Sequence, residues 1–446
     1  AAPDAPLVQA LADVPPTEFV GYEQLAAPAT VLAIVRGEAR VAEAAGDAGL
    51  IGILLDRTPF YAEAGGQVGD TGRLVGDGVE VAIDDVKALP GARRLHLGRV
   101  VRGTLREGLR LQAEVDAARR WNIMRNHTAT HLLHKALKVV LGEHANQAGS
   151  LVAPDRLRFD FTHLEALTPD QLTRIEDLVN DQILKGVPVT AYYTSLREAR
   201  EAGAMALFGE KYGDEVRVVK IGDFSLELCG GTHVANTGQV GLFKVIAESS
   251  VGSGARRIEA LTGPAALTYV RRIAGELEAV ADRLRCGPLE ASERVDELLE
   301  QQRALERTLA QQKQQAARAA AERLLSASQR IDGVNVVIGR APVDDAEALR
   351  RMGDYLRDRL GSAVVVLGAE AGGRALLVAM ATADIVRRGF HAGKLVQRIA
   401  PLVGGGGGGR PDVAQAGGKE PDQLEEALST ARSLIEQDLG AARQRA

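Results

Sequence analysis

The N-terminal part of the chain alternates short apolar runs with glycine and aspartate turns. Three runs rich in β-branched and aliphatic residues span 30–35, 50–55 and 79–83. Runs of this length between turn residues are typical of strands. We therefore expect residues 1–118 to form a β-barrel domain.

From Trp121 the apolar positions follow helical spacing, and this pattern ends at Leu141. Several histidines stand among the leucines of this segment, which predicts a buried helix with polar groups on one side. Strand-like runs and a further helical pattern follow it. We expect residues 119–263 to form an α+β domain with a zinc site.

Two stretches rich in Ala, Leu, Glu, Gln and Arg come next, at 265–286 and 291–328. The Gly-Pro pair between them breaks a helix, so residues 264–330 are expected to form an antiparallel helical hairpin. Glutamines interrupt the apolar seam that a firm coiled coil requires. Residues 331–446 again alternate strand and helix patterns, which predicts a small α/β domain. The expected fold class is multidomain α+β.

The composition is ordinary for a soluble globular protein, with 446 residues, 46% of them apolar and 25% charged. No stretch approaches the roughly 18 consecutive apolar residues of a membrane-spanning helix. The two cysteines, Cys229 and Cys286, exclude a disulfide framework. We expect a reducing, cytoplasmic location.

The net charge is −5, which argues against a protein that binds nucleic acid through its overall charge, because such domains are usually basic. A local basic surface remains open. The first residue is not Met, which suggests an excised or processed fragment.

His127 and His131 lie four residues apart in the predicted helix, so their side chains share one face and could bind one metal ion. No glutamate stands between them, so the zinc-protease motif is absent. The spacing alone is a weak signal, since such histidines are often merely exposed or hydrogen-bonded.

A Cys-Gly-Gly-Thr-His run, which begins at Cys229 and ends at His233, follows a strand-like stretch. The glycines allow the backbone to turn, so that a thiolate and an imidazole can converge. A lone cysteine is more often a small buried apolar residue, but with the histidine pair it completes a set of ligand types that suits zinc. We expect one Zn²⁺ per chain, bound by His127, His131, Cys229 and His233.

Five segments resemble the editing part and the C-terminal domain of alanyl-tRNA synthetases. They include AsnHisThrAlaThrHisLeuLeuHis and CysGlyGlyThrHisVal, which are similar to the two metal motifs of the family's editing domain. In chain order, and in the family's order, the segments span 56–72, 126–134, 229–234, 252–260 and 409–418. The resemblance implies an aminoacyl-tRNA deacylase that hydrolyses the ester of tRNA(Ala) misacylated with serine or glycine.

Physics explains why such an activity is needed. A pocket that binds alanine cannot exclude glycine and poorly rejects an added hydroxyl, so binding discriminates by roughly 10 to 200-fold. A second, hydrolytic site must supply the remaining discrimination between alanine and the wrong amino acids. No segment resembles an ATP-binding class II core, so no aminoacylation is expected from this chain.

The resemblance also suggests which polar groups meet the substrate. Gln147 is similar to a glutamine of the family's editing site, and Thr128 and Thr130 are further candidates for a contact with the serine hydroxyl. Each could instead serve only in capping or turn hydrogen bonds. Asp160, in a predicted strand, could orient a metal ligand or be a solvated carboxylate.

The role of the metal stays open at this point. Four protein ligands make a closed site, which is typical of structural zinc, whereas catalytic zinc keeps a position open. Zinc could activate water, or it could hold the amino group of the ester while another group activates water. We favour the positioning role.

Basic residues at two places suit RNA. Arg256 and Arg257, beside two glycines, are expected to contact the phosphates of a tRNA 3′ end, unless they are plain surface arginines. The run Gly404, Gly405, Gly406, Gly407, Gly408 and Gly409 resembles a glycine loop of the family's C-terminal domain, where backbone N–H groups could bind phosphate. Lys394, Arg398 and Arg410 add positive charge there. In the family this domain binds tRNA and, in some members, forms a homodimer.

Other interpretations differ in what the chain does with tRNA. It could be a stand-alone editing protein, or a tRNA-binding module whose zinc is structural. A phosphoesterase is disfavoured because the sequence contains no Asp-His-His run. Hydrolysis that depends on the metal separates the enzyme from the binding module.

Overall fold

The computed structural model describes residues 7, 9, 11–205, 213–252 and 254–443. Ser253, in one of the predicted RNA-binding segments, lies outside the described residues. The chain forms two compact units, Ala1–Ala279 and Val280–Ala446. No described helix is both long enough and apolar enough to cross a membrane.

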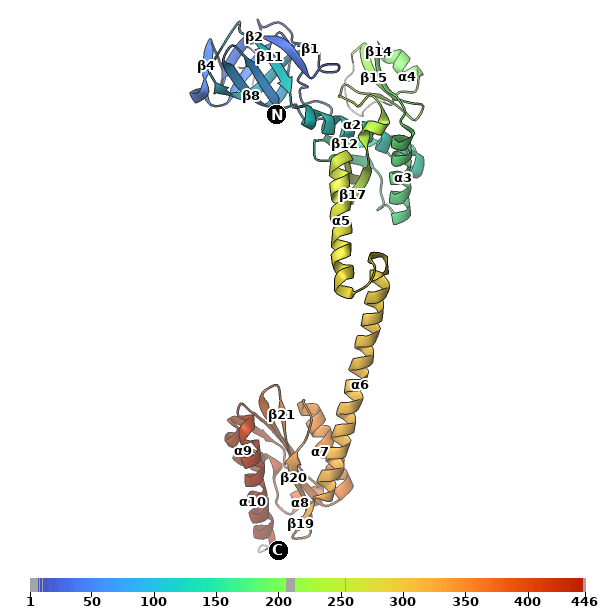
Figure 1. The fold of residues 1–446 in the computed structure, drawn as a ribbon. Coiled ribbons are helices and arrows are strands. Elements are labelled where there is room, and N and C mark those ends of the chain that lie inside the picture. The colour runs from blue at the N-terminus through green and yellow to red at the C-terminus, as the bar shows by residue number, and fades with distance from the viewer. Residues whose placement is uncertain (1–6, 8, 10, 206–212, 253, 444–446) are drawn as a thin grey trace. The chain divides into compact units, whose positions relative to one another are not determined.

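A closed six-stranded barrel forms the start of the first unit (Figure 1, blue to cyan). Its apolar core includes Ile34, Ile53, Phe60 and Leu74, all with no exposed surface. Strands β2, β8 and β11 largely alternate buried with more exposed side chains, whereas every residue of β5 is buried. In neighbour order the barrel strands are β11 (Arg110–Val115), β7 (Gly72–Gly76), β8 (Val79–Leu89), β9 (Arg93–Arg102), β5 (Ile51–Leu55) and β2 (Ala26–Arg36), with β2 pairing back to β11.

Short elements complete this part of the chain. β3 (Ala39–Val41) extends β2, β4 (Glu43–Ala45) pairs with β10 (Thr104–Arg106), and β1 (Glu18–Phe19) lies parallel to β6 (Arg57–Thr58). The predicted β-barrel is therefore confirmed.

The predicted histidine-bearing helix is α2 (Ala117–Leu141). It begins earlier than expected because Asp116 caps it, accepting a hydrogen bond from the backbone N–H of Arg119 at 3.0 Å. The polar side chains of its middle turns are buried along with the leucines. Such burial requires partners for each polar group.

Two sheets surround α2 in the rest of the first unit. One has the order β12 (Gln147–Val152), β13 (Leu157–Thr162), β18 (Ala255–Thr262) and β17 (Phe243–Gly252), and the other is β14 (Val189–Ser195), β15 (Glu215–Ile221) and β16 (Ser225–Leu228). Helix α3 (Pro169–Lys185) packs beside α2, its first turn closed by a capping box between Thr168 and Gln171. The shorter helices are α4 (Leu196–Glu201) and η2 (Thr237–Val240).

The predicted helical arm consists of α5 (Gly263–Leu284), η3 (Pro288–Glu290) and α6 (Ala291–Ser326). The break between the long helices falls at the Gly-Pro pair, as the sequence indicates. Their pairing as an antiparallel hairpin stays a prediction.

The second unit contains a six-stranded sheet with helices on both faces (Figure 1, orange to red). In neighbour order its strands are β19 (Gln329–Ile331), β20 (Val334–Arg340), β21 (Ala363–Ala371), β22 (Arg374–Ala381), β24 (Val413–Gly418) and β23 (Gly405–Gly409). Helix α7 (Ala346–Leu360) connects β20 to β21, the one parallel pair among these described strands. The expected α/β character of this region is confirmed.

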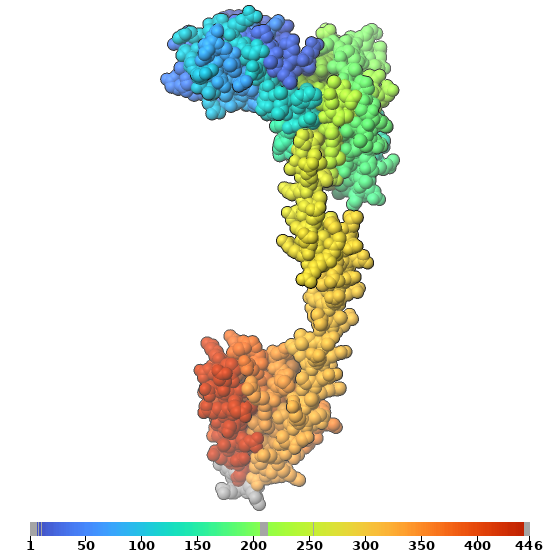
Figure 2. Space-filling view, viewed as in Figure 1, coloured from blue at the N-terminus to red at the C-terminus, as the bar shows by residue number. Residues whose placement is uncertain are grey.

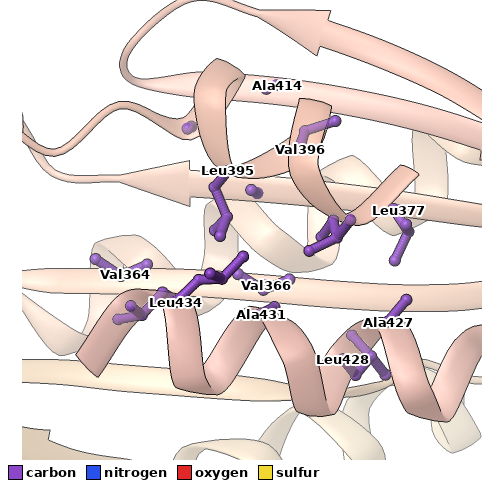
Figure 3. Close-up of a cluster of buried hydrophobic side chains, with 14 of the residues drawn as sticks. Val364, Val366, Leu377, Leu395, Val396, Ala414, Ala427, Leu428, Ala431 and Leu434 are labelled. Carbon is purple, nitrogen blue, oxygen red and sulfur yellow. The ribbon is translucent and has the colours of Figure 1, made fainter. Parts of the chain in front are cut away.

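One face of this sheet is covered by α9 (Ala392–Ile399) and α10 (Leu424–Arg443), while α8 (Ala383–Arg387) lies before α9 in the chain. Val364 and Val366 of the sheet meet Leu395 and Leu428 in the buried cluster shown in Figure 3. In the space-filling view the visible face of this part of the chain is a continuous surface (Figure 2, orange to red).

The expected glycine loop is largely a strand, which corrects the prediction. Gly405–Gly409 form β23, an edge strand antiparallel to β24, and Gly404 precedes it with a φ of 64°. A Cβ on Gly405, Gly407 or Gly409 would overlap β24 atoms. Gly405, Gly407 and Gly409 are therefore glycine because two backbones approach closely, and pairing with β24 uses the N–H groups on one side of this edge strand.

Candidate metal centre

Four side chains converge in the first unit although they come from distant parts of the sequence. His127 and His131 are four residues apart on α2, and Cys229 and His233 lie in the loop that follows β16. One ligand atom from each falls within 4.8 Å of all the others. The four residues predicted as zinc ligands are thus brought together.

The distances between these ligand atoms suit zinc. Cys229 Sγ lies 3.3 Å from Nε2 of His127 and 3.3 Å from Nε2 of His233. A tetrahedral site with the usual Zn–S and Zn–N bond lengths separates sulfur from nitrogen by about 3.5 Å. The loop also needs a glycine at 231, since a Cβ on Gly231 would overlap the His127 ring.

Each histidine of the group uses Nδ1 for a contact with the protein. Nδ1 of His127 lies 2.6 Å from Gln67 Oε1, and the backbone N–H of Thr232 donates to the same oxygen at 3.0 Å. The amide N–H of Gln67 in turn donates to Thr232 Oγ1 at 2.9 Å. Because Oε1 accepts, His127 must carry its proton on Nδ1, which leaves Nε2 free to bind a metal.

A buried carboxylate occupies the equivalent place beside His131. Glu227, only 2% exposed, has Oε2 at 2.8 Å from His131 Nδ1 and Oε1 at 3.2 Å from His134 Nδ1. Ser225 donates a hydrogen bond to Oε1 at 3.1 Å. Nε2 of His131 is buried and has no hydrogen-bond partner among the described groups. A buried nitrogen without a partner is costly, and a metal at the centre of the group would satisfy it.

The third imidazole is held by Thr128. Nδ1 of His233 lies 3.2 Å from Thr128 Oγ1, which also accepts the backbone N–H of Val234 at 3.3 Å. All three histidines therefore direct Nδ1 to a neighbour and keep Nε2 for the centre, the arrangement typical of metal-binding histidines.

The charge of the site also suits a divalent cation. Burial disfavours the Cys229 thiolate, but the surrounding imidazoles outweigh it and lower the pKa of the thiol well below its usual range. Burial likewise opposes ionisation of Glu227, yet His131 and His134 lower the pKa of its carboxyl to about 2. Two buried anions require positive charge, and Zn²⁺ would supply it.

The other predicted catalytic residues have defined partners. Thr130 Oγ1 donates to the backbone carbonyl of Asn126 at 2.8 Å, a bond within α2. Gln147 begins β12 and its amide donates to Ser150 Oγ at 3.1 Å. Asp160 forms two hydrogen bonds with Arg257, at 2.7 and 2.8 Å. Of these, Gln147 is the residue whose side-chain oxygen has no hydrogen bond to the described part of the chain.

The predicted RNA-binding cations differ in how far they are neutralised. Arg256 is paired with Glu248 at 2.5 Å and Arg257 with Asp160 at 2.7 Å. Arg398 lies 3.9 Å from Asp438, and Arg410 lies 3.2 Å from Asp412. Lys394, in the first turn of α9, has no ion pair with a described carboxylate.

Sequence reasoning missed Gln67 and Glu227. For Glu227 a signal existed, because Ser225 and Glu227 alternate along β16 and Cys229 comes two residues after Glu227, directly beyond the strand's end. For Gln67 the signal was weaker, since it lies in the predicted barrel domain and only the fold brings it to α2.

A buried ion pair fixes the barrel to α2 near this site. Arg120 and Asp70 are both about 1% exposed and contact each other through several atoms, including a 2.9 Å bond from Nε to Oδ1. Arg120 also donates to the backbone carbonyls of Gly21 and Pro59, at 2.7 and 2.8 Å. These contacts set the position of Gln67 relative to the helix.

Three family models match the chain. They are described as tRNA synthetases class II (A), over residues 4–119, Threonyl and Alanyl tRNA synthetase second additional domain, over 216–259, and DHHA1 domain, over 333–437. The first match includes the segment 56–72, one of the five that resemble alanyl-tRNA synthetases, and the structure there is largely the β-barrel.

Relatives match almost the whole chain. The alanine–tRNA ligase of Pelotomaculum thermopropionicum is 52% identical over 428 residues, which are 96% of this chain and 49% of that protein. The alanine–tRNA ligase of Bacillus subtilis is 47% identical over 421 residues, 94% of this chain and 47% of that protein. The chain thus spans about half the length of the curated relatives it matches.

Among solved structures, the C-Ala domain from Aquifex aeolicus alanyl-tRNA synthetase is 27% identical and covers 25% of this chain and 96% of that chain, with a TM-score of 0.22. The sequence matches confirm the resemblance to alanyl-tRNA synthetases that the motifs predicted.

Proposed function

We propose that this chain is the editing half of an alanyl-tRNA synthetase, which hydrolyses the aminoacyl ester of tRNA(Ala) misacylated with serine or glycine. The similarity to alanine–tRNA ligases over 96% of the chain supports the enzyme family. The observation that carries the proposal is the group of three imidazoles and one thiol with all four ligand atoms within 4.8 Å.

His127, His131, Cys229 and His233 would hold Zn²⁺ in this site. When bound, zinc supplies a Lewis acid that can bind an amine or lower the pKa of a water molecule. Four protein ligands fill a tetrahedral site, so an amine or a water molecule could reach the metal only if the coordination expanded or one ligand were released. Of the two roles, we favour holding the substrate's amino group. Gln67, Glu227 and Thr128 keep the imidazoles in one orientation, so the donor set is preorganised for the ester.

Recognition of the misplaced amino acid falls to Gln147 in this proposal. Thr128 Oγ1 is engaged with His233 and Val234, and Thr130 is bonded within α2. The oxygen of Gln147 is free to accept from a serine hydroxyl, and its amide is already oriented by Ser150. A polar group placed for this hydroxyl is what separates a seryl from an alanyl ester.

The second unit would bind the body of the tRNA. Lys394, Arg398 and Arg410 lie on or near α9 and the end of β23. Their charges suit the phosphate backbone. Formation of a homodimer through this unit is part of the proposal, as is RNA contact by Arg256 and Arg257, which requires their present ion pairs to open.

Deacylation of Ser-, Gly- and Ala-charged tRNA(Ala) tests the function, with zinc content measured on the same samples. We expect the first two substrates to be hydrolysed faster than Ala-tRNA, and expect Cys229→Ala to lose zinc and activity together. Equal rates on all three would refute editing. Full activity without metal would refute the role of zinc, whereas tRNA binding without any hydrolysis would favour a binding module with structural zinc.

A further inference from the structure

A row of side chains leads across the three-stranded sheet to the metal ligand Cys229. Tyr193 of β14 is directly opposite Arg217 of β15. The backbone N–H of Cys229 donates to the Arg217 carbonyl at 3.0 Å, which continues the same pairing to the next strand. Residues directly opposite each other in neighbouring strands share one face of a sheet, so Tyr193, Arg217 and Cys229 lie side by side.

The N-terminal part of the chain places two aromatic rings, Phe19 and Tyr22, and a further arginine, Arg94, against this row of side chains. Tyr22 lies over Arg217, with the guanidinium carbon 4.0 Å from the ring centre, and its hydroxyl donates to the Gly230 carbonyl at 2.7 Å. Phe19 meets Tyr22 edge-on at 4.9 Å, and Arg94 lies 4.3 Å from the centre of the Phe19 ring. Two aromatic rings in contact with each other therefore lie between two guanidinium groups beside the metal centre.

Neither arginine is neutralised within the described part of the chain. Arg217 donates to the carbonyls of Cys229 and Gly231, at 2.8 and 3.0 Å, but pairs with no described carboxylate. Arg94 also forms no ion pair with a described carboxylate, and its Nε is buried without a hydrogen-bond partner. Burial lowers the pKa of Arg94. Two partly desolvated cations without counter-charges are unfavourable alone, so this cluster is suited to an anionic ligand.

The cluster also offers exposed ring surface at a useful distance. Tyr22 is 40% exposed and Tyr193 is 60% exposed. Strands are spaced about 4.8 Å apart, so Tyr193 lies roughly 10 Å from Cys229 along the sheet. One nucleotide can bridge that length with its base on the tyrosine and its ribose ester toward the ligand group.

We propose that these residues bind the terminal nucleotide of the single-stranded RNA end that carries the ester. Tyr193 stacks on the base, Arg217 with its covering Tyr22 forms the wall beside it, and Arg94 takes a phosphate. Bases stack on aromatic rings and arginine planes in single-stranded recognition. This inference rests on the proposed function, which brings an aminoacyl ester to the metal centre.

Two RNAs test the stacking step, namely a stem-loop with an intact single-stranded 3′ end and the same RNA without its last nucleotide. For Tyr193→Ala we expect about tenfold weaker binding of the intact RNA and unchanged binding of the shortened one. Tyr192→Ala is the matched control, because Tyr192 is the adjacent residue and is 42% exposed, but points to the opposite face. Equal effects of the two substitutions, or equal affinity of the parent protein for both RNAs, would overturn the proposal.

The phosphate contact is tested by salt dependence. Arg94→Gln should reduce the slope of log affinity against log salt by about 0.7 for a single-stranded contact. Arg99→Gln, in the same strand but paired with Asp84 at 2.8 Å, should leave the slope unchanged. A slope that is the same for Arg94→Gln and the parent refutes this contact. Zinc content and circular dichroism verify that each variant is folded.

The outcome is separable from that of the proposed function. If the parent hydrolyses no charged tRNA but Tyr193→Ala still selectively weakens the intact RNA, the nucleotide site stands and the editing function fails. If hydrolysis is present and Tyr193→Ala leaves both kcat and KM for Ser-tRNA(Ala) unchanged, the editing function stands and the nucleotide site fails.

Discussion

Gln67 Oε1 lies 2.6 Å from Nδ1 of His127, so a residue of the barrel orients a ligand on α2. Gln67 has no exposed surface and is also bonded to Thr232, next to His233. One amide therefore links the barrel, the helix and the Cys-Gly-Gly-Thr-His loop. The candidate metal centre is therefore completed by a residue of the barrel segment and not by α2 and the loop after β16 alone.

Replacing Gln67 should weaken zinc binding. For Gln67→Ala we expect about 10 to 100-fold lower zinc affinity, because the His127 ring loses the partner that fixes its tautomer and orientation. Gln67→Glu keeps an oxygen acceptor for His127 and should reduce the zinc affinity less than Gln67→Ala does. Competition with a chromophoric chelator measures the affinity, and Gln112→Ala in the same barrel is the control. Parent-like affinity in Gln67→Ala would contradict an orienting role.

Glu227 should matter in the same way for His131. Glu227→Ala removes the acceptor at 2.8 Å from Nδ1 and leaves both His131 and His134 without a buried partner. We expect about 10 to 100-fold weaker zinc binding and an altered visible spectrum of the cobalt-substituted protein, with Glu227→Gln intermediate. Asp160→Ala, which removes the partner of Arg257, should leave the cobalt spectrum unchanged. A spectrum unaffected by Glu227→Ala would show that the carboxylate does not shape the site.

The Arg120–Asp70 pair should contribute to stability more than any surface ion pair of the chain. Breaking it by Arg120→Ala leaves Asp70 buried without its cation, which costs about 3–5 kcal/mol. Arg73→Ala, which removes an exposed ion pair with Glu114, should cost less than about 1 kcal/mol. Urea denaturation, followed by the fluorescence of Trp121, measures the free energy of unfolding of both variants. Similar losses in the two variants would mean that the buried pair is dispensable.

The sequence predicted much of this arrangement because its signals are local. The four-residue spacing of His127 and His131 is a property of one helix, and the Cys229 to His233 run is a property of one loop. The partners of their Nδ1 atoms are not local, since Gln67 reaches His127 only after the barrel closes. The glycine run was expected to be a loop because composition does not record that β24 approaches Gly405, Gly407 and Gly409 closely enough to exclude a Cβ.

The barrel should also lose stability in mild acid through His96. This side chain is fully buried, with Nε2 at 2.7 Å from Thr58 Oγ1 and Nδ1 at 3.1 Å from the Ile53 carbonyl. Burial lowers the pKa of its imidazole to about 4 from the ordinary value of 6.5. Between these values the unfolded chain binds a proton that the folded barrel excludes. The stabilisation is therefore complete above pH 6.5 and is lost as the pH falls to 4.

The difference amounts to about 3 kcal/mol across this pH range. Hydrogen exchange of the β5 and β9 amides, corrected for intrinsic rates, measures this change in the stability of the barrel. His96→Asn cannot titrate, so we expect it to be less stable than the parent at pH 7 but to lose less stability between pH 6.5 and 4. His391→Asn, in the second unit, should keep the parent's pH dependence in these strands. If His96→Asn and the parent lose protection equally over this range, another group controls the acid sensitivity of the barrel.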